Sequence, residues 1–420
     1  MESLWVSHMV PYPPKSGALI RAYNLLKALA QRHPVDLVAF VQEPLMRTLF
    51  QDPRQGIAEC HRELARLCRE VKFLPIERLA RPFGKARTAL ESLAEGSGYM
   101  AEWLRSREAV SAISALTARN RYAVAHLDTI SLARYRDLLP TVPATLGHHN
   151  VESHLMQRRT GTESNLMKKM YFRQEAGRLA TFEREQVPRF AANIVCSELD
   201  AQRLREIVPG AQTETIPNGV DCGYFRPAGG AQQPDSMIFV GTLDWYPNTA
   251  AVLYLLREIW PRLLQLRSNA TLHIVGANAP QEIVRAARAV AGVTQHGFVP
   301  DVRPLIDSAT IYVCPIRDGG GTKLKILEAC AMRKCIVADP VACEGIKVQN
   351  GVSVELAETP EKFVRSLIRL LDRPDTRAAM GRAARALAES EYSFDIIGGR
   401  FVQVLERVAA QPVSYGGPAR

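Results

Sequence analysis

Short apolar segments alternate with longer amphipathic segments along almost the whole chain, and this alternation restricts the possible folds more than any other feature. We expect strands at residues 4–8, 35–41, 71–76, 122–127, 144–147, 192–196, 213–216, 237–241, 271–276, 293–295, 310–314, 335–338 and 352–354. Many of these segments are apolar throughout, which is typical of strands covered on both faces. Because helical segments separate them, the pattern predicts an α/β protein with doubly wound parallel sheets.

A stretch rich in Gly, Pro, Asn and Gln, IPNGVDCGYFRPAGGAQQPDS, separates two similarly built halves. At 420 residues the chain is also longer than one hydrophobic core normally organises. The predicted parts are a Rossmann-like N-terminal domain (1–215), an interdomain linker (216–235), a Rossmann-like C-terminal domain (236–390), a helix that crosses back to the first domain (391–410) and a disordered tail (411–420). Since ligands of such sheets bind beyond the carboxyl ends of the strands, two facing sheets would form a cleft between the domains.

The composition is that of a soluble globular protein, with 47% apolar and 23% charged residues. No apolar run reaches the ~18 residues of a membrane-spanning helix. The start, MESLWVSHMVPYPP, lacks the basic region and long apolar core of a signal peptide. The eight cysteines form no CxxC pair, so we expect reduced, mostly buried thiols and a cytoplasmic location.

The net charge of +10 is unevenly distributed. Residues 1–200 hold 28 Lys and Arg against 21 Asp and Glu, whereas residues 201–420 hold 25 against 22. A basic N-terminal half could meet an anionic membrane surface or an acidic substrate, or it could simply be a soluble surface. Nucleic acid is not expected as a partner, because the basic residues are dispersed and no zinc-finger spacing or RNP-like aromatic run accompanies them.

The glycine-rich stretch PIRDGGGTKLKILEACAM leads into a predicted helix. Lys323 and Lys325 are predicted to lie in its first turn, where the partial positive charge of the helix end disfavours each lysine by about 0.3–1 kcal/mol. A bound phosphate would remove this conflict, because glycine-rich turns that open a helix bind anions. A flexible loop with solvated lysines is the alternative.

Polar residues also follow three predicted strands of the first half. Gly17 lies in the loop after the first strand, where a ligand could approach the backbone or the chain could simply enter a helix. His126 and Asp128 stand at the end of the fourth strand, and Asp128 could accept a proton, hold a substrate hydroxyl or cap the next helix.

After the fifth strand, the sequence GHHNVESH contains His148, His149 and Asn150. Adjacent histidines point in different directions, and no carboxylate lies at a fixed short spacing from them. We therefore expect no metal here and favour hydrogen bonding to a substrate hydroxyl.

In the second half, VGTLDWYPN follows a strand and opens a helix at Pro247 or Asn248. The sequence QHGFVPDVRPLI contains a turn that could present backbone groups to the edge of a base; its residues are Gly297, Phe298 and Val299. Glu328 borders an apolar face one and a half turns into the helix after the glycine-rich loop. A buried Glu needs a partner, for which a ribose diol and a buried Arg are the two candidates.

Other nucleotide-binding motifs do not fit. GGGTK differs from a P-loop because Thr322 precedes Lys323, and no G-x-G-x-x-G follows the first strand. An Asp-x-Asp motif, which metal-bound nucleotide-sugar sites usually contain, is also absent from the sequence.

Several motifs together resemble the retaining glycosyltransferases of family 4, which have the two-domain GT-B fold. The most specific are IPNGVDCGYFRP, GFVPDVRPLIDSATIYVCP and GGGTKLKILEACAM. PYPPKSGALIRAYNLLKALAQRH and HHNVES are similar to bacterial polysaccharide-type members. In order and spacing, the resemblance extends from the first strand to about residue 407.

The resemblance implies a nucleotide-diphosphate sugar donor, with a UDP- or GDP-sugar expected, bound mainly by the C-terminal domain. It implies a saccharide or lipid-linked acceptor bound mainly by the N-terminal domain, and no cofactor. Glu328 would hold the donor ribose, while Gly297, Phe298 and Val299 would contact the base. The sugar-diphosphate end would be cradled by Gly319, Gly320, Gly321 and Thr322.

In the first half of the chain, the resemblance implies that Asp128 and His149 lie beside the transferred sugar. Asp128 stands where many members have the second His of a His-x-His motif, and His149 matches a His after the fifth strand. We expect both to orient donor and acceptor in a dissociative transfer with retention, in which the leaving diphosphate helps to deprotonate the acceptor. The expected setting is bacterial surface polysaccharide synthesis.

The chain departs from the family pattern at two places. Of the usual Glu-x7-Glu pair only Glu328 is present, because Gly320 stands at the first position. The Arg and Lys that normally neutralise the diphosphate are replaced by Thr242 and Asn248, which follow Gly241. We therefore expect this charge to be met by other basic residues, with Lys323 stabilising the leaving group; the candidates are Arg317, Lys323 and Lys325.

These departures leave two other functions open. A catalytically inactive member, acting in assembly or regulation, would bind donor without turnover, whereas a GT-B sugar-nucleotide epimerase would turn over without an acceptor. Residues 151–188 are predicted to form one or two helices. Within them, RRTGTESNLMKKMYFR mixes basic and apolar residues, which suits peripheral docking at the inner face of a membrane or a solvated or domain-packing helix.

Overall fold

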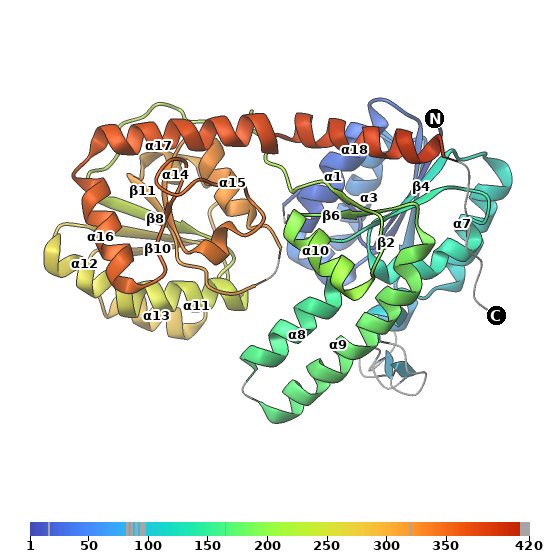
Figure 1. Ribbon diagram of the computed structural model, residues 1–420, viewed down its shortest axis with the longest axis horizontal. Coiled ribbons are helices and arrows are strands. Elements are labelled where there is room, and N and C mark those ends of the chain that lie inside the picture. The colour runs from blue at the N-terminus through green and yellow to red at the C-terminus, as the bar shows by residue number, and fades with distance from the viewer. Residues whose placement is uncertain are drawn as a thin grey trace. The chain divides into compact units, whose positions relative to one another are not determined.

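The computed structural model describes residues 1–15, 17–80, 84, 87–88, 91–92, 98–163, 165–319 and 321–411. Internal contacts divide the chain into two compact units. The first unit comprises Met1–Pro217 and Ile397–Arg420, and the second comprises Asn218–Ile396. Each unit is built around one sheet whose strands are all parallel (Figure 1).

The first unit has a seven-stranded sheet in the order β3-β2-β1-β4-β5-β6-β7. Its strands are β1 (Ser3–Ser7), β2 (Val35–Val41), β3 (Glu70–Pro75), β4 (Val124–Leu127), β5 (Ala144–Gly147), β6 (Ala192–Val195) and β7 (Thr213–Thr215). The α-helices are α1 (Gly17–Ala30), α2 (Glu43–Leu49), α3 (Pro53–Ala65), α4 (Glu77–Ala80), α6 (Tyr99–Glu102), α7 (Arg107–Arg119), α8 (Glu152–Thr162), α9 (Leu166–Gln186), α10 (Glu198–Ile207) and most of α18 (Phe394–Ala409), with 3-10 turns η1 (Ile130–Leu138) and η2 (Val187–Arg189).

Both faces of this sheet are covered, as the apolar strands predict. Successive side chains of β1 alternate between two hydrophobic cores, with Leu4 and Val6 in one and Trp5 in the other. The second core includes the C-terminal part of α18, where Phe401 packs against Trp5 with ring centroids 5.6 Å apart. The polar residues that follow the strands form the site described below.

The second unit has a six-stranded sheet in the order β10-β9-β8-β11-β12-β13. Its strands are β8 (Ser236–Val240), β9 (Thr271–Val275), β10 (Val293–Gly297), β11 (Ile311–Cys314), β12 (Cys335–Ala338) and β13 (Glu355–Leu356). Its α-helices are α11 (Tyr246–Tyr254), α12 (Trp260–Leu266), α13 (Gln281–Arg288), α14 (Arg303–Ser308), α15 (Leu324–Ala331), α16 (Pro360–Leu371) and α17 (Pro374–Leu387), with π-helical segments η3 (Leu255–Ile259) and η5 (Ala388–Tyr392) and a 3-10 turn η4 (Pro340–Cys343).

One predicted strand is displaced. Residues 352–353 lie in a turn that the Gly351 amide closes by donating to the Val354 carbonyl at 2.9 Å; Val354 forms an isolated bridge with Asn350, and pairing with β12 starts only at Glu355. The apolar segment VSV was read as a strand because its period could not reveal this turn. Every other predicted strand overlaps an observed one, so the prediction of doubly wound parallel sheets is confirmed.

The cysteines agree with the sequence prediction, since all eight are free thiols and only Cys222 is not fully buried. Among the helices in the described ranges, none combines the length and the apolarity needed to cross a bilayer.

Candidate functional site

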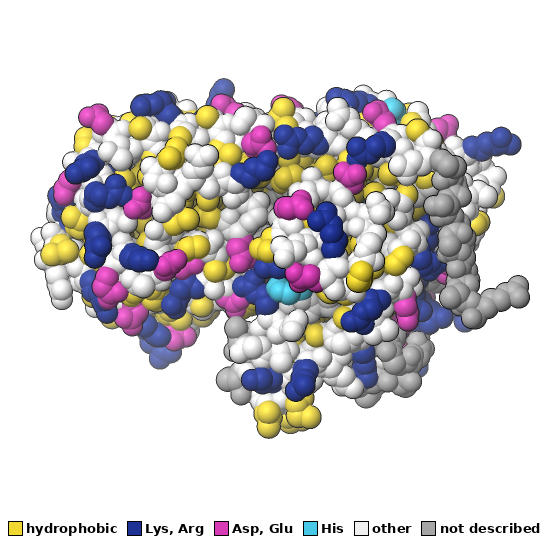
Figure 2. All heavy atoms as spheres, viewed as in Figure 1, with side chains coloured by type: hydrophobic (Ala, Val, Ile, Leu, Met, Phe, Trp, Pro, Cys, Tyr) yellow, Lys and Arg dark blue, Asp and Glu magenta, His cyan; other side chains and the backbone are white. Residues whose placement is uncertain are grey.

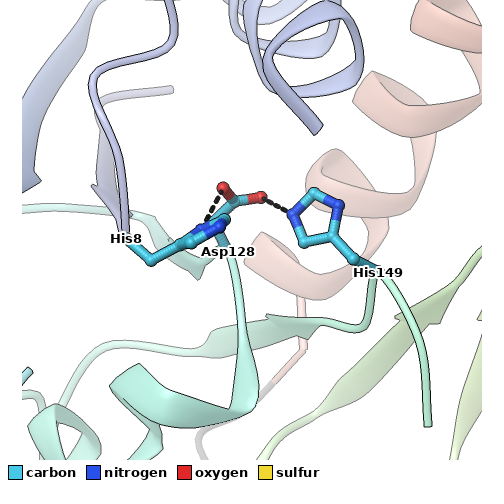
Figure 3. Close-up of side chains that lie close together, drawn as sticks. All are labelled: His8, Asp128 and His149. Atoms are coloured by element: carbon cyan, nitrogen blue, oxygen red, sulfur yellow. Dashed lines mark ion pairs between the residues drawn. The ribbon is translucent and has the colours of Figure 1, made fainter. Parts of the chain in front are cut away.

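The first group of polar residues gathers where three neighbouring strands of the first unit end. β1, β4 and β5 lie side by side in the sheet, so the residues that follow them meet at one edge. Figure 3 shows the Asp128 carboxyl group between two imidazole rings. His8 Nδ1 lies 3.3 Å from one carboxylate oxygen, and His149 Nε2 lies 3.3 Å from the other. We call these three residues the Asp128 cluster.

The carboxylate of Asp128 is held in its charged form. Its side chain is 6% exposed, and Ser7 donates a hydrogen bond to it from Oγ at 3.2 Å. Burial by itself would raise the pKa of Asp128, but the contacts with His149, His126 and His8 hold that pKa well below its usual value. Burial lowers the pKa of His149, an effect that the nearby carboxylate partly opposes. The cluster therefore offers a fixed negative charge that is only partly shielded by histidines.

The structure removes one of the roles that the sequence left open for Asp128. The following 3-10 turn begins at Ile130 with Thr129 at its N-cap, so the helix-capping alternative is wrong. Asp128 instead faces the end of the sheet, because its backbone N–H continues the ladder by donating to Val6 O at 3.0 Å. His126 is enclosed behind it, with Nδ1 2.8 Å from Thr145 Oγ1.

Adjacent histidines diverge as predicted. His148 is buried, with Nε2 3.1 Å from Asn193 Oδ1, and burial lowers its pKa to about 4. His149 points the other way, to Asp128. His8 was not recognised from the sequence as part of a site; its signal was its position directly after β1, the strand that lies beside β4.

Among the described residues, those of the Asp128 cluster lie close enough together to hold a metal ion. One ligand atom from each of the three lies within 4.8 Å of the other two. Two imidazoles and a carboxylate form a ligand set that zinc accepts. The sequence argument against a metal considered only residues that are neighbours along the chain. In the structure, the three possible ligands come from the loops that directly follow β1, β4 and β5. The same distances suit direct pairing of histidine with carboxylate, so a metal-free site remains our prediction.

The second group of polar residues lies at the glycine-rich loop of the second unit. Gly319 and Gly321 have φ angles of +98° and +69°, in the left-handed region that favours glycine. Lys323 is only 4% exposed, and its ammonium donates to the carbonyls of Gly319 at 2.6 Å and Gly321 at 3.0 Å. Gly320, which was also predicted to bind the donor, lies outside the described residues.

The two lysines of this loop therefore differ. Helix α15 begins at Leu324 with Lys323 at the N-cap, so only Lys325 lies in the first turn as predicted. Both are at least half-buried, and the alternative of solvated lysines is wrong. The ammonium of Lys323 serves the loop itself by holding two of its carbonyl groups.

Lys325 reaches across to the helix that follows the neighbouring strand. Its Nζ donates to Asn248 Oδ1 at 2.6 Å and lies 4.7 Å from the centre of the Phe239 ring. Asn248 in turn donates from Nδ2 to Thr242 O at 2.7 Å. A Cβ atom at Gly241 would lie 2.4 Å from Lys325 Nζ, so glycine leaves the space that the ammonium occupies.

Two further polar side chains of the same loop and helix are Thr322 and Glu328. Thr322 Oγ1 is buried and has no hydrogen-bond partner among the described residues. Burial raises the pKa of the Glu328 carboxyl to about 7, although the nearby charge of Lys325 acts in the opposite direction. Burial also lowers the pKa of Lys325. A ligand with both an anionic group and hydroxyl groups would satisfy all three side chains.

The other predicted site residues occupy the edges of the two units. The exposed Arg317 stacks on Tyr254, with its guanidinium carbon 3.7 Å from the ring centre. Gly297 ends β10 with a φ of +68°, and the ring of Phe298 beside it is 75% exposed; Val299 is partly buried. Gly17 is the exposed first residue of α1. Their predicted contacts with donor or acceptor stay predictions.

Comparison with known proteins shows which families and folds this chain resembles. Residues 234–373 match the family model described as "Glycosyl transferases group 1". The chain is 30% identical over 215 residues to the GDP-mannose-dependent monoacylated alpha-(1-6)-phosphatidylinositol monomannoside mannosyltransferase of Corynebacterium glutamicum, covering 46% of this chain and 56% of that protein. It is 29% identical over 188 residues to an Anaeromyxobacter UDP-N-acetylglucosamine–N-acetylmuramyl-(pentapeptide) pyrophosphoryl-undecaprenol N-acetylglucosamine transferase, covering 41% and 46%. The chain thus spans about half the length of the curated relatives it matches.

Solved structures match over nearly the full chain. Sucrose-phosphate synthase from Thermosynechococcus elongatus has a TM-score of 0.69 at 16% identity, covering 98% of this chain and 100% of that one. HepE from Anabaena, solved with UDP and glucose, has a TM-score of 0.63 at 15% identity, covering 97% and 100%. At these identities the likeness shows the fold, with two parallel-sheet α/β units. Residues 234–373 are thus similar to the group 1 glycosyl transferases, and the chain has the GT-B fold.

Proposed function

We propose that this protein is a glycosyltransferase that moves a sugar from a nucleotide-diphosphate sugar to a saccharide or lipid-linked acceptor with retention of configuration. The observation that carries the proposal is the group formed by Lys325 and Glu328 of α15 with Asn248 of α11. It combines a buried cation, a helix N-terminus and a carboxylate, which are the groups that a diphosphate and a ribose require.

The diphosphate would bind at Lys325. The family resemblance implies an Arg and a Lys, in many members, at the positions of Thr242 and Asn248, and here the ammonium of Lys325 lies 2.6 Å from Asn248 Oδ1. The positive charge would thus come from Lys325 of α15 instead of a residue of α11, and it lies beside Asn248. The amide oxygen of Asn248 carries no net charge, so an anion would gain a charge-assisted hydrogen bond from Lys325 there. The loop amides at the start of α15 would add further donors.

The ribose would bind at Glu328. A carboxylate accepts hydrogen bonds from two neighbouring hydroxyl groups, and the nearby charge of Lys325 favours the ionised form of Glu328. The exposed ring of Phe298 and the bend at Gly297 would meet the base. The Corynebacterium relative uses GDP-mannose, the Anaeromyxobacter relative uses UDP-N-acetylglucosamine, and HepE was solved with UDP, so a UDP- or GDP-sugar is the proposed donor.

The first unit would bind the acceptor and position the transferred sugar. The fixed charge of Asp128 suits a hydroxyl donor and would also stabilise positive charge developing on the sugar ring. His149 and His8 hold this carboxylate in place. Because both curated relatives named above act on lipid-linked acceptors, such an acceptor and a role in surface polysaccharide synthesis at the cytoplasmic side are proposed here.

In the proposed reaction, the bond between the anomeric carbon and the diphosphate oxygen breaks first, leaving an oxocarbenium-like sugar. The acceptor oxygen then bonds to the same face of that carbon, and its proton passes to the departing diphosphate. Lys325 would stabilise the negative charge of the leaving group, and Lys323 would keep the loop in shape. No covalent sugar–enzyme intermediate is required.

Calorimetric titration of UDP, GDP and ADP tests the donor site. We expect one nucleotide to bind selectively and Glu328→Ala to weaken it about tenfold or more, as is typical when hydrogen bonds to a charged group are lost. Because ribose binding favours the ionised Glu328, whose pKa is about 7, wild-type affinity should rise between pH 6 and pH 8. Any pH dependence shared with the variant comes from groups other than Glu328, such as the phosphate or Lys325.

The titration also separates the alternatives. Absence of binding by all three nucleotides would count against a donor site in this unit. Selective binding without turnover in the presence of acceptors would favour an inactive assembly or regulatory subunit, which the glycine at position 320 makes a specific second candidate. Turnover of the sugar nucleotide without acceptor would favour an epimerase.

Retention is tested by the anomeric configuration of the product. With an α-linked nucleotide sugar as donor, we expect the proton NMR signal of the new linkage to show the α configuration from the earliest time point. A β-linked first product would show inversion and would require the acceptor oxygen to attack from the opposite face, with a base that accepts its proton.

A further inference from the structure

The helical hairpin formed by α8 and α9 ends in a surface that the proposed reaction does not use. The two helices pack along each other and extend from the sheet of the first unit (Figure 1). Near the end of the hairpin, the guanidinium of Arg159 on α8 stacks over the ring of Phe172 on α9, 4.4 Å from its centre. The later part of α9 enters the core through Leu179 and Phe182. The first turns of α9 are therefore held firmly by a buried base.

Large apolar side chains are exposed together on these first turns. Leu166 is 70% exposed, Met167 82%, Met170 65% and Tyr171 38%. Apolar side chains at a protein surface are normally scattered singly, and a contiguous group marks an interaction site. In Figure 2 the end of the hairpin shows hydrophobic side chains beside Lys and Arg side chains. We call Leu166–Arg173 the hairpin tip.

The charges of the tip are all of one sign. Lys168, Lys169 and Arg173 are exposed on the same turns, and the sequence from Asn165 to Gln174 contains no Asp or Glu. Basic residues interleaved with Leu, Met and Tyr suit a surface that is anionic outside and apolar just beneath. An aqueous acidic ligand would use the lysines but would gain nothing from four exposed apolar side chains.

We propose that the hairpin tip docks on the surface of a bilayer containing anionic phospholipids. Leu166, Met167 and Met170 would enter the boundary between headgroups and acyl chains, and the basic side chains would pair with lipid phosphates. A second copy of the chain fits less well, because a two-fold contact would bring the same lysines and arginine face to face. This docking does not depend on the proposed chemistry and would hold for a catalytically inactive member as well.

Flotation of the full chain with vesicles tests the proposal. We expect binding to vesicles that contain phosphatidylglycerol, little binding to vesicles of phosphatidylcholine alone, and weaker binding as salt is added. Lys168→Gln with Lys169→Gln should weaken binding on the order of tenfold or more, since each basic residue contributes near an anionic surface. Met167→Ser with Met170→Ser should weaken it comparably by removing the inserted groups.

Leu266→Ser serves as the matched control, because Leu266 is 67% exposed at the end of α12 and lies far along the chain from the tip. The control should bind vesicles like the wild type, and all variants should keep the wild-type nucleotide affinity. Equal binding by the tip variants and the wild type would overturn the proposal. A wild type that does not bind anionic vesicles would also overturn it. If that wild type is a dimer in analytical ultracentrifugation, and Met167→Ser with Met170→Ser dissociates the dimer, the tip instead contacts a second copy of the chain.

Discussion

Replacing Lys325 by methionine is expected to weaken binding of the nucleoside diphosphate by about 10–100-fold and to lower turnover by at least as much. A hydrogen bond to a charged group contributes about 1.5–3 kcal/mol, and each 1.4 kcal/mol corresponds to a factor of ten. Methionine keeps an apolar chain beside Phe239 and removes only the ammonium. Calorimetry with the diphosphate and with the corresponding nucleoside measures the effect, because the nucleoside should bind both proteins equally.

Lys323→Met provides the comparison within the same loop. Its ammonium is bound to two carbonyl groups, so its loss should lower the thermal unfolding midpoint and disturb binding of diphosphate through the loop. Lys325→Met should change affinity with little change in that midpoint. If donor affinity and turnover stay intact in both variants, neither lysine meets the diphosphate and the assignment of this charge is wrong.

Replacing Asp128 by asparagine is expected to reduce kcat by about 100-fold or more while leaving nucleotide affinity unchanged. Asparagine keeps the shape but removes the charge that would stabilise the sugar in the transition state, and loss of one such group typically costs a factor of about 10²–10³. Nucleotide affinity should stay because the proposed nucleotide site lies in the other unit. Steady-state kinetics with a fixed acceptor, together with calorimetry, measures both quantities.

Asp375→Asn is a suitable control, since Asp375 is an exposed residue in the first turn of α17. Treatment of the wild type with a chelator tests the other interpretation of the Asp128 cluster. We expect full activity after EDTA. Loss of activity that a divalent cation restores, together with loss of metal content in Asp128→Asn, would instead make His8, Asp128 and His149 metal ligands.

Local patterns in the sequence predicted much of each unit. Apolar strands such as 35–41 and 144–147 agree with β2 and β5 because burial on both faces leaves a signal within a few residues. Because the strand ends could be located in this way, Asp128 and His149 were recognised as polar residues that directly follow strands. The segment 352–354 was misplaced because a turn closed by Gly351 has no distinct period. The predictions for Gly320 and for most of the tail fall outside the described residues.

The tertiary structure alone decided which residues meet. His8 joins Asp128 because β1 lies beside β4, although 120 residues separate the two side chains in the sequence. Lys325 approaches Asn248 because β8 and β11 are neighbours, so that the helices after them start side by side. Lys323 and Lys325 looked equivalent in the sequence, and only the direction of each side chain separated a loop-holding lysine from one available to a ligand. The sequence by itself therefore determined the elements, the family resemblance and the candidate residues. Strand order and side-chain direction, which depend on contacts between distant segments, determined how those residues are combined into sites.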